Sequence, residues 1–196
     1  MRKTKTLIPA IAIALLLTAS CGVLNQVGLG GHTYTFNSLP QNVDELTALS
    51  FDMTDPYAVA ALTIAALTRY GTSSRDCMRM LDYLKGPESV SGYEAQFIGE
   101  RLKGKEYKPF SFFKGAVPSN NYTPSRPYSI TVTSNPYSFT TDSEGYKWCT
   151  LYVNSGGADN PRPIKLRQKK STGEWFLNDI QCLSDIRIPT SQSKWD

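Results

Sequence analysis

Apolar residues recur at helical spacing in three stretches of the first half of the chain. These stretches predict helices over residues 56–71, 74–85 and 91–104. Asp55 followed by Pro56 is a typical N-cap with proline at the first helical position, and the motif SGYE from Ser91 forms a capping box. The first helix has no polar face, so we expect it to be buried on all sides.

The other two predicted helices each carry one apolar stripe, which we expect to face the core. In the second helix the stripe consists of Cys77, Met80, Leu81 and Leu84. In the third helix it consists of Tyr93, Phe97, Ile98 and Leu102. A short strand at 33–36 precedes the helices and is followed by a predicted loop to about residue 52.

After about residue 106 the apolar pattern changes to a period of two, which is typical of half-buried strands. The residues expected to face the core are Ile130, Val132, Cys149, Leu151, Val153, Ile164, Leu166, Trp175 and Leu177. Turn-forming clusters, among them the hairpin turn Asp142–Gly145, separate these runs. The order of elements predicts an α+β domain in which three N-terminal helices pack on a C-terminal antiparallel sheet.

The first twenty residues have the pattern of a secretory signal. Arg2, Lys3 and Lys5 precede an apolar run over residues 7–19, which would form a helix of roughly 20 Å. A bilayer core about 30 Å thick needs roughly 20 apolar residues, so the run is too short to span it well. We therefore interpret residues 1–20 as a cleaved signal peptide.

The end of this segment resembles a bacterial lipobox, in which a cysteine is joined to diacylglycerol and becomes the new N-terminus. Ala19 and Ser20 are the expected small residues before Cys21, whereas Thr18 replaces the commoner leucine. The alternative is an ordinary secretory signal that happens to end before a cysteine. The lipobox interpretation predicts a signal peptide at 1–20, a lipidated tether at 21–32 and a single α+β domain at 33–196. It places the domain on the extracytoplasmic face of a bacterial membrane. Because Gly22 stands where an aspartate would retain the protein in the inner membrane, sorting to the outer membrane of a two-membrane cell is allowed.

Charge and histidine content exclude several classes of function. Loss of the signal lowers Lys plus Arg from 21 to 18, against 17 Asp plus Glu, so the mature chain has no basic excess that would favour nucleic acid. His32, in the tether, is the single histidine, which excludes a Ser-His-Asp triad and a His₃ metal centre. The pattern predicts no cofactor and no metal site.

Three cysteines remain after Cys21, namely Cys77, Cys149 and Cys182, and no CxxC spacing occurs. One disulfide can form outside the cytoplasm, and Cys149 with Cys182 is the preferred pair because both lie in the strand-rich half. Three buried thiols are the alternative.

Two loops contain candidate binding residues. The segment SNNYTPSRPY supplies Asn121, Tyr122 and Tyr128, which could stack on a sugar or peptide. The segment SGGADNPR supplies Asp159 and Arg162, beside glycines whose amides could bind an anion. Both segments are also rich in ordinary turn formers, and this structural interpretation is the alternative.

Charged residues near the C-terminus have two further interpretations. A basic stripe of Arg162, Lys165, Arg167, Lys169 and Lys170 either binds anionic lipids or cell-wall polymers or forms the solvated face of an edge strand. Carboxylates at Asp159, Asp179 and Asp185 would be needed by an envelope hydrolase, although an ion pair of Asp185 with Arg187 is the simpler expectation.

Three long segments carry a resemblance to a known family. They are YLKGPESVSGYEAQFIGERLKGKEYKPFSFFKGAVPSNNYTPSRPYSITVTSNPYSF, NSGGADNPRPIKLRQKKSTGEWFLND and LSDIRIP. Over residues 38–189 the chain resembles a bacterial family known only as a domain of unknown function, which supplies no catalytic residues. Its architecture is also loosely similar to the cone-shaped roll of nuclear-transport-factor-like domains, which often hold a small ligand between helices and sheet.

Together these observations favour a lipid-anchored domain that acts by binding a small ligand, a cell-wall polymer or an envelope protein. A carboxylate-dependent envelope hydrolase and a purely structural envelope component are the alternatives.

Replacement of Cys21 by alanine is expected to abolish lipid attachment and to move the protein from the membrane to the soluble fraction. Replacement of Cys77 by alanine is the matched control and should leave the protein in the membrane. Intact-mass spectrometry of the native product checks the modification, and a free thiol at residue 21 or an uncleaved leader would contradict it.

Overall fold

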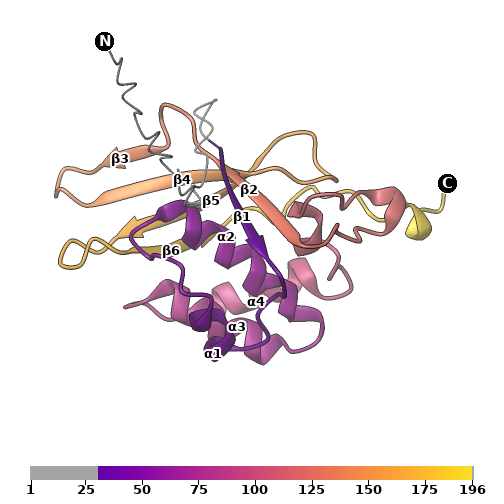
Figure 1. Ribbon diagram of the computed structural model, residues 1–196, viewed down its shortest axis with the longest axis horizontal. Coiled ribbons are helices and arrows are strands. Elements are labelled where there is room, and N and C mark those ends of the chain that lie inside the picture. Colours follow the sequence, from indigo (N-terminus) through magenta and orange to yellow (C-terminus); the bar gives the residue numbers. More distant parts are fainter. Residues whose placement is uncertain (1–30, 196) are drawn as a thin grey trace, which may run out of the picture.

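The computed structural model describes residues 31–195 and has the predicted α+β fold, with helices packed against an antiparallel sheet (Figure 1). The helices are α1 (Val43–Ala48), α2 (Pro56–Leu67), α3 (Ser74–Lys85) and α4 (Gly92–Leu102). The strands are β1 (Gly31–Phe36), β2 (Tyr128–Thr133), β3 (Phe139–Thr141), β4 (Lys147–Val153), β5 (Arg162–Gln168) and β6 (Trp175–Ile180).

All neighbouring strands are antiparallel, in the order β1-β2-β4-β5-β6, and β3 pairs with the first half of β4. Strand β1 comes before the helices but pairs with β2, so the sheet joins the two halves of the chain. Strand β1 begins at Gly31, two residues earlier than predicted. His32 therefore lies in a strand and stacks on Tyr57 rather than belonging to a tether.

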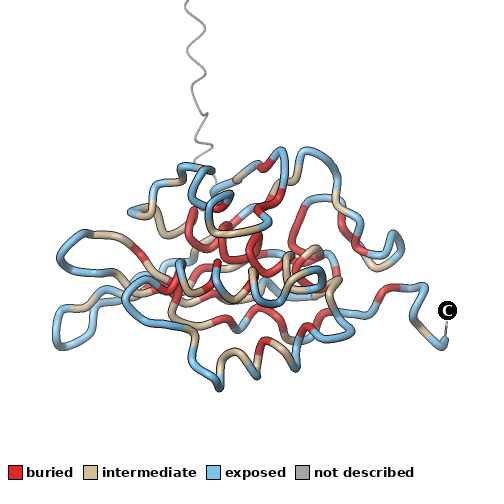
Figure 2. The backbone as a smooth tube through the Cα atoms, turned by 90° about the horizontal axis from the view of Figure 1, so that it is seen from below, coloured by how far each residue is buried: buried red, intermediate tan, exposed pale blue. Residues whose placement is uncertain are grey.

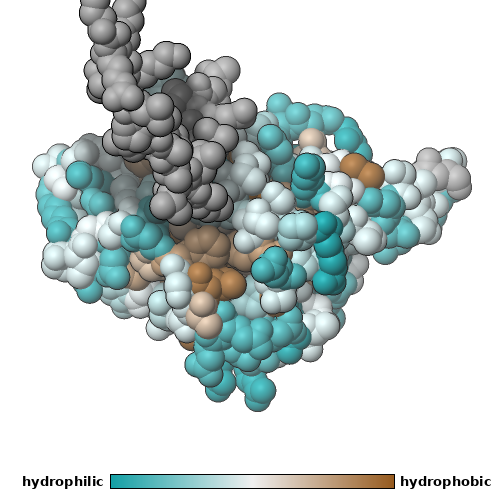
Figure 3. Space-filling view, viewed as in Figure 1, coloured by the Kyte–Doolittle hydropathy of each residue, from teal (hydrophilic) through white to brown (hydrophobic). Residues whose placement is uncertain are grey.

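Helix α2 lies between the sheet and α3, and ten of its twelve residues are buried. Apolar residues gather over this central region in Figure 3, whereas much of the surrounding surface is hydrophilic. Thr63 in the middle of the helix is fully buried, and its hydroxyl donates to the carbonyl of Val59 at 2.9 Å. The buried hydroxyl is thereby satisfied, and the prediction of a helix without a polar face is confirmed.

Side-chain caps begin the helices where the sequence predicted them. Asp55 accepts a hydrogen bond from the Tyr57 amide and a second from the Tyr34 hydroxyl, which joins β1 to the start of α2. Burial and the bond to Asp55 raise the pKa of Tyr34. Ser91 and Glu94 form the predicted reciprocal capping box of α4.

The alternation of the strands is confirmed, because every strand residue predicted to face the core is buried. Buried positions run through the middle of the molecule, and exposed positions gather in the loops at its ends (Figure 2). Two details differ from the prediction. Tyr93 is 79 % exposed, since it lies in the first turn of α4, outside the reach of the core that buries Ile98 and Leu102. Residues 43–48, predicted as loop, form α1, whose first turn is held by Asn42.

The predicted signal peptide, Cys21 and most of the tether lie outside the described residues. Within residues 31–195, no helix has the length and apolar character needed to cross a bilayer.

Gly86 is expected to tolerate no side chain. It follows α3 with φ of +65°, and an added Cβ would lie 2.2 Å from Cδ1 of Phe176. Gly86→Ala should lower the free energy of unfolding by about 1–3 kcal/mol from backbone strain, in addition to the displacement of the ring. Urea unfolding measures the loss. Gly92→Ala is the control, because nothing lies within 4 Å of its Cβ, and equal stability of the two variants would contradict the prediction.

Candidate functional site

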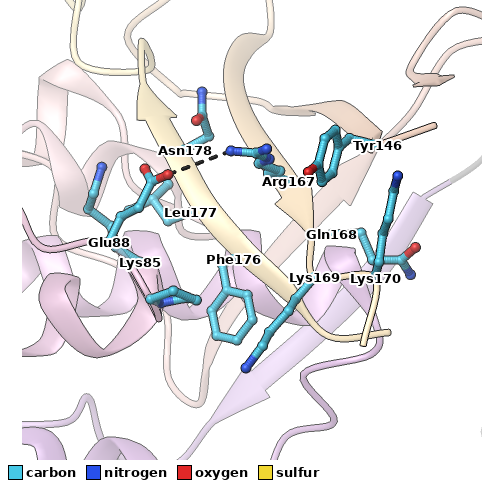
Figure 4. A pocket seen from close by; sticks show the side chains of 11 residues that line it. Lys85, Glu88, Tyr146, Arg167, Gln168, Lys169, Lys170, Phe176, Leu177 and Asn178 are labelled. Carbon is cyan, nitrogen blue, oxygen red and sulfur yellow. Dashed lines mark ion pairs between the residues drawn. The ribbon is translucent and has the colours of Figure 1, made fainter. Parts of the chain in front are cut away.

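A pocket lies where the end of α3 meets the hairpin between β5 and the edge strand β6 (Figure 4). Its volume is about 180 Å³. The pocket is lined by Lys85, Pro87, Glu88, Tyr146, Arg167, Gln168, Lys169, Lys170, Phe176, Leu177 and Asn178. The wall is mostly apolar, and the charged groups on it are predominantly basic.

Arg167 is the best-positioned cation of the pocket. Its guanidinium carbon lies 4.6 Å from the ring centre of Tyr146 and 4.8 Å from that of Trp148. Glu88, after α3, approaches the guanidinium at 3.6 Å (Figure 4). The Glu88 side chain is 62 % exposed, so this ion pair contributes little to stability. The rings therefore hold Arg167, while Glu88 is weakly held and exchangeable.

The hairpin turn before β4 orients both aromatic rings. The Asp142 carboxylate accepts hydrogen bonds from the Tyr146 amide and from Nε1 of Trp148, each at 2.9 Å. The bond from Trp148 and those from the backbone hold the pKa of Asp142 below its usual value. A turn predicted only as a connector thus fixes the rings on which Arg167 rests.

The opposite wall is formed by α3 and the residues that follow it. Lys85 is buried, and its ammonium donates to Glu94 at 2.6 Å. Partial burial acts to raise the pKa of Glu94, but the hydrogen bonds from Lys85 and Ser91 outweigh it and hold the pKa low. Lys85 is thus neutralised inside the protein, and the free positive charge of the pocket belongs to the β5–β6 hairpin.

That hairpin adds Lys169 and Lys170 to Arg167. The Lys170 ammonium lies 4.0 Å from the ring centre of Tyr146 and donates to the Glu144 carbonyl. Arg167, Lys169 and Lys170 carry three positive charges and Glu88 carries one negative charge, so this end of the pocket has a net positive charge. Phe176 and Leu177 supply apolar surface beside it (Figure 4). The arrangement is suited to an anionic group attached to a short apolar segment.

The structure does not assemble the site predicted in the loop 118–128. Tyr122 is only 2 % exposed, stacks on Tyr107 and donates from its hydroxyl to the Arg187 carbonyl at 2.7 Å. Burial raises the pKa of Tyr122 to about 12. Asn121 contacts Ser191, and Tyr128 packs on Phe113. Tyr122 is therefore a core residue, and these side chains form no shared stacking surface.

The loop 155–162 is a structural connector. The amide of Gly156 donates to the Ser111 carbonyl at 2.8 Å, and that of Gly157 donates to the Ser155 hydroxyl at 3.1 Å. A Cβ on Gly156 would lie 1.9 Å from the Ala116 carbonyl oxygen, so glycine is needed for close approach of the backbone. Both amides are engaged within the protein, and the predicted anion nest does not form.

Each candidate carboxylate has its own polar partner. Asp159 pairs with Arg187, whereas Asp185 lies 3.9 Å from Arg162, so the expected Asp185–Arg187 pair is replaced by two crossed pairs. Asp179 accepts from the side chain of Gln181 at 2.7 Å. The three carboxylates are thus each engaged by another side chain, and no hydrogen bond joins two of them within residues 31–195.

Cys77, Cys149 and Cys182 are all buried and free. The disulfide predicted between Cys149 and Cys182 is not formed in the structure, in which both sulfurs are thiols of the core. Across residues 31–195, no group of three or more His, Cys, Asp or Glu side chains is placed to hold a metal ion.

The fold and the pocket define an α+β domain with a basic, partly aromatic recess at the edge of its sheet. The chain belongs to the family described as Domain of unknown function (DUF6935), which matches residues 38–190. Neither the curated proteins nor the solved structures contain a match to it.

Sequence reasoning found part of this pocket and missed the rest. The basic stripe contained Arg167, Lys169 and Lys170, but a solvated strand face was the preferred interpretation. The missing signal was the pairing of Arg167 with Trp148 across β4 and β5, which places a cation over a ring. Lys85 and Glu88 also line the pocket, but they lie about eighty positions before Arg167, so no local pattern connects them with it.

The three thiols are expected to resist alkylation in the native protein at about pH 8, because burial raises each pKa to about 12 and the thiolate is the reactive form. In urea without reductant all three should react with iodoacetamide, as counted by mass spectrometry. Alkylation of Cys77 alone would reveal a Cys149–Cys182 disulfide and contradict the prediction.

Proposed function

We propose that this protein is a lipid-anchored binding protein on the extracytoplasmic face of a bacterial membrane, and that it binds an anionic group in the pocket at Arg167. The lipobox-like sequence ending at Cys21 supports the location. The observation that carries the binding proposal is the Arg167 guanidinium, held on two aromatic rings with the exposed Glu88 as its one anionic partner among residues 31–195.

The chemistry of the pocket favours a carboxylate or a phosphate as the bound group. A guanidinium presents paired donors that match the oxygens of either anion. Lys169 and Lys170 add positive charge that attracts it, and Phe176 accommodates adjoining apolar atoms. An incoming anion would take the place of Glu88.

The size of the pocket limits the ligand. Its 180 Å³ is below the roughly 300–1,000 Å³ of pockets that enclose a drug-sized molecule. The pocket would therefore hold one end of a longer molecule, such as an acidic residue or phosphate of a cell-wall polymer or an acidic side chain of an envelope protein. The pocket lies between α3 and the sheet, as the ligand sites of nuclear-transport-factor-like rolls do. We include a similarity to these rolls in the proposal.

Titration with inorganic phosphate, glycerol phosphate and acetate, followed by the fluorescence of Trp148 beside Arg167, tests the proposal. Arg167→Gln should weaken binding of the preferred anion roughly tenfold or more, since a hydrogen bond to a charged group contributes about 1.5–3 kcal/mol. Glu88→Gln should tighten binding, because it removes the competing carboxylate. Higher salt should weaken binding in each protein.

Arg126→Gln is the matched control, because Arg126 also lies over a tyrosine ring, 4.8 Å from the centre of Tyr128, but outside the pocket. It should bind like the parent protein. Equal affinities of the Arg167, Glu88 and Arg126 variants would overturn the assignment of the pocket as an anion site.

A further inference from the structure

A second surface lies beside the point at which the described chain begins. Gly31 opens β1 and pairs with Thr133 at the end of β2, so the turn from β2 to β3 adjoins it. Figure 1 shows the start of β1 and this connection together at one edge of the sheet. We call Gly31, His32, Tyr57, Tyr137 and Phe139 the tether-side surface.

Aromatic rings form a continuous row through this surface. The His32 ring stacks on Tyr57 at 3.8 Å, Tyr57 lies 6.3 Å from Phe139, and Phe139 lies 6.1 Å from Trp175. The Tyr57 hydroxyl donates to the Ser134 hydroxyl at 2.8 Å, which ties the row to the β2–β3 turn. Tyr137 and Phe139 are 86 % and 48 % exposed. Tyr57 is packed between His32 and Phe139, whereas His32, Tyr137 and Phe139 face solvent.

Two of the three segments that build this surface contain no charged residues. Neither residues 127–141 nor residues 31–43 include Asp, Glu, Lys or Arg, although 19 % of the whole chain is charged. The third segment contains Tyr57, which follows the α2 N-cap Asp55 by two residues. Tyr93 provides a contrast, because it is also highly exposed but lies on α4 among Glu94, Glu100 and Arg101. Tyr93 is thus an exposed ring among charged residues, whereas Tyr137 and Phe139 are exposed rings in a segment without charge.

We propose that the tether-side surface rests in the headgroup region of the bilayer, with Tyr137 and Phe139 inserted. Tyrosine and other aromatic rings favour the membrane–water interface, whereas charged side chains are costly at greater depth. Gly31 follows Cys21 by ten positions, which span at most roughly 35 Å, so the surface next to Gly31 is the part of the domain held closest to the lipid. The inference rests on the proposed anchor at Cys21, but not on the anion pocket.

The test uses the full mature protein with Pro136→Cys, labelled with a polarity-sensitive fluorophore and reconstituted in vesicles of phosphatidylcholine and phosphatidylglycerol. Pro136 is exposed in the β2–β3 turn, and the native thiols at Cys77, Cys149 and Cys182 are buried, so the label enters one site. The label should shift to shorter wavelength and be quenched by headgroup spin-labelled lipid. Tyr93→Cys, labelled in the same way, should show neither change.

Adding Tyr137→Ser and Phe139→Ser should abolish the shift while the protein still floats with the vesicles. Emission at position 136 equal to that at position 93 would overturn the inference and leave the anchor intact. A shift that depends on protein density or on an added envelope protein would also overturn it, because a second copy or a protein partner would then cover the surface. Protein that fails to float at all would instead refute the anchor.

Discussion

Helix α2 is apolar on every face, and ten of its twelve residues are buried. The helix offers no polar face to water, so the sheet must cover one side and α3 the other. Strands β2, β4, β5 and β6 contact the helix from the C-terminal half of the chain, and β1 contacts it from the N-terminal half. The Tyr34–Asp55 hydrogen bond joins β1 to the first turn of the same helix. One apolar helix thus determines how both halves of the chain assemble.

The two proposed functional surfaces follow from this assembly. Because α3 packs over α2 and touches β6, its end is carried to the edge of the sheet, where Glu88 meets Arg167. Because β1 pairs with β2, the point nearest the proposed anchor lies beside the uncharged β2–β3 turn. The basic recess is centred on β5 and the aromatic surface on β1 and the β2–β3 turn, and the two approach each other at β6, where Trp175 ends the aromatic row and Phe176 lines the recess. A lipid-bound domain can in this way be oriented by one surface while it binds with another.

Local rules predicted the helices and strands well, because their signals lie within a few residues of one another. The caps at Asp55 and Ser91 form as expected, and the inward residues of each strand are buried. Failures occurred where a residue's partner is distant in sequence. Tyr122 was expected at a rim but is enclosed by Tyr107 and the Arg187 backbone, and Asp185 pairs with Arg162 rather than with its neighbour Arg187. Composition alone does not distinguish a buried tyrosine from a binding tyrosine.

Periodicity, caps and the lipobox-like motif are local patterns, so the residues alone were enough to predict the fold class and the apolar centre and to expect a lipid anchor at Cys21. Which charged and aromatic residues share a surface became known from the folded chain. Arg167, Trp148, Tyr146 and Glu88 come from separate segments, and strand register and the packing of α3 bring them together. The same holds for His32, Tyr57 and Phe139. Such contacts depend on how elements pack, and side-chain chemistry along one segment does not encode them.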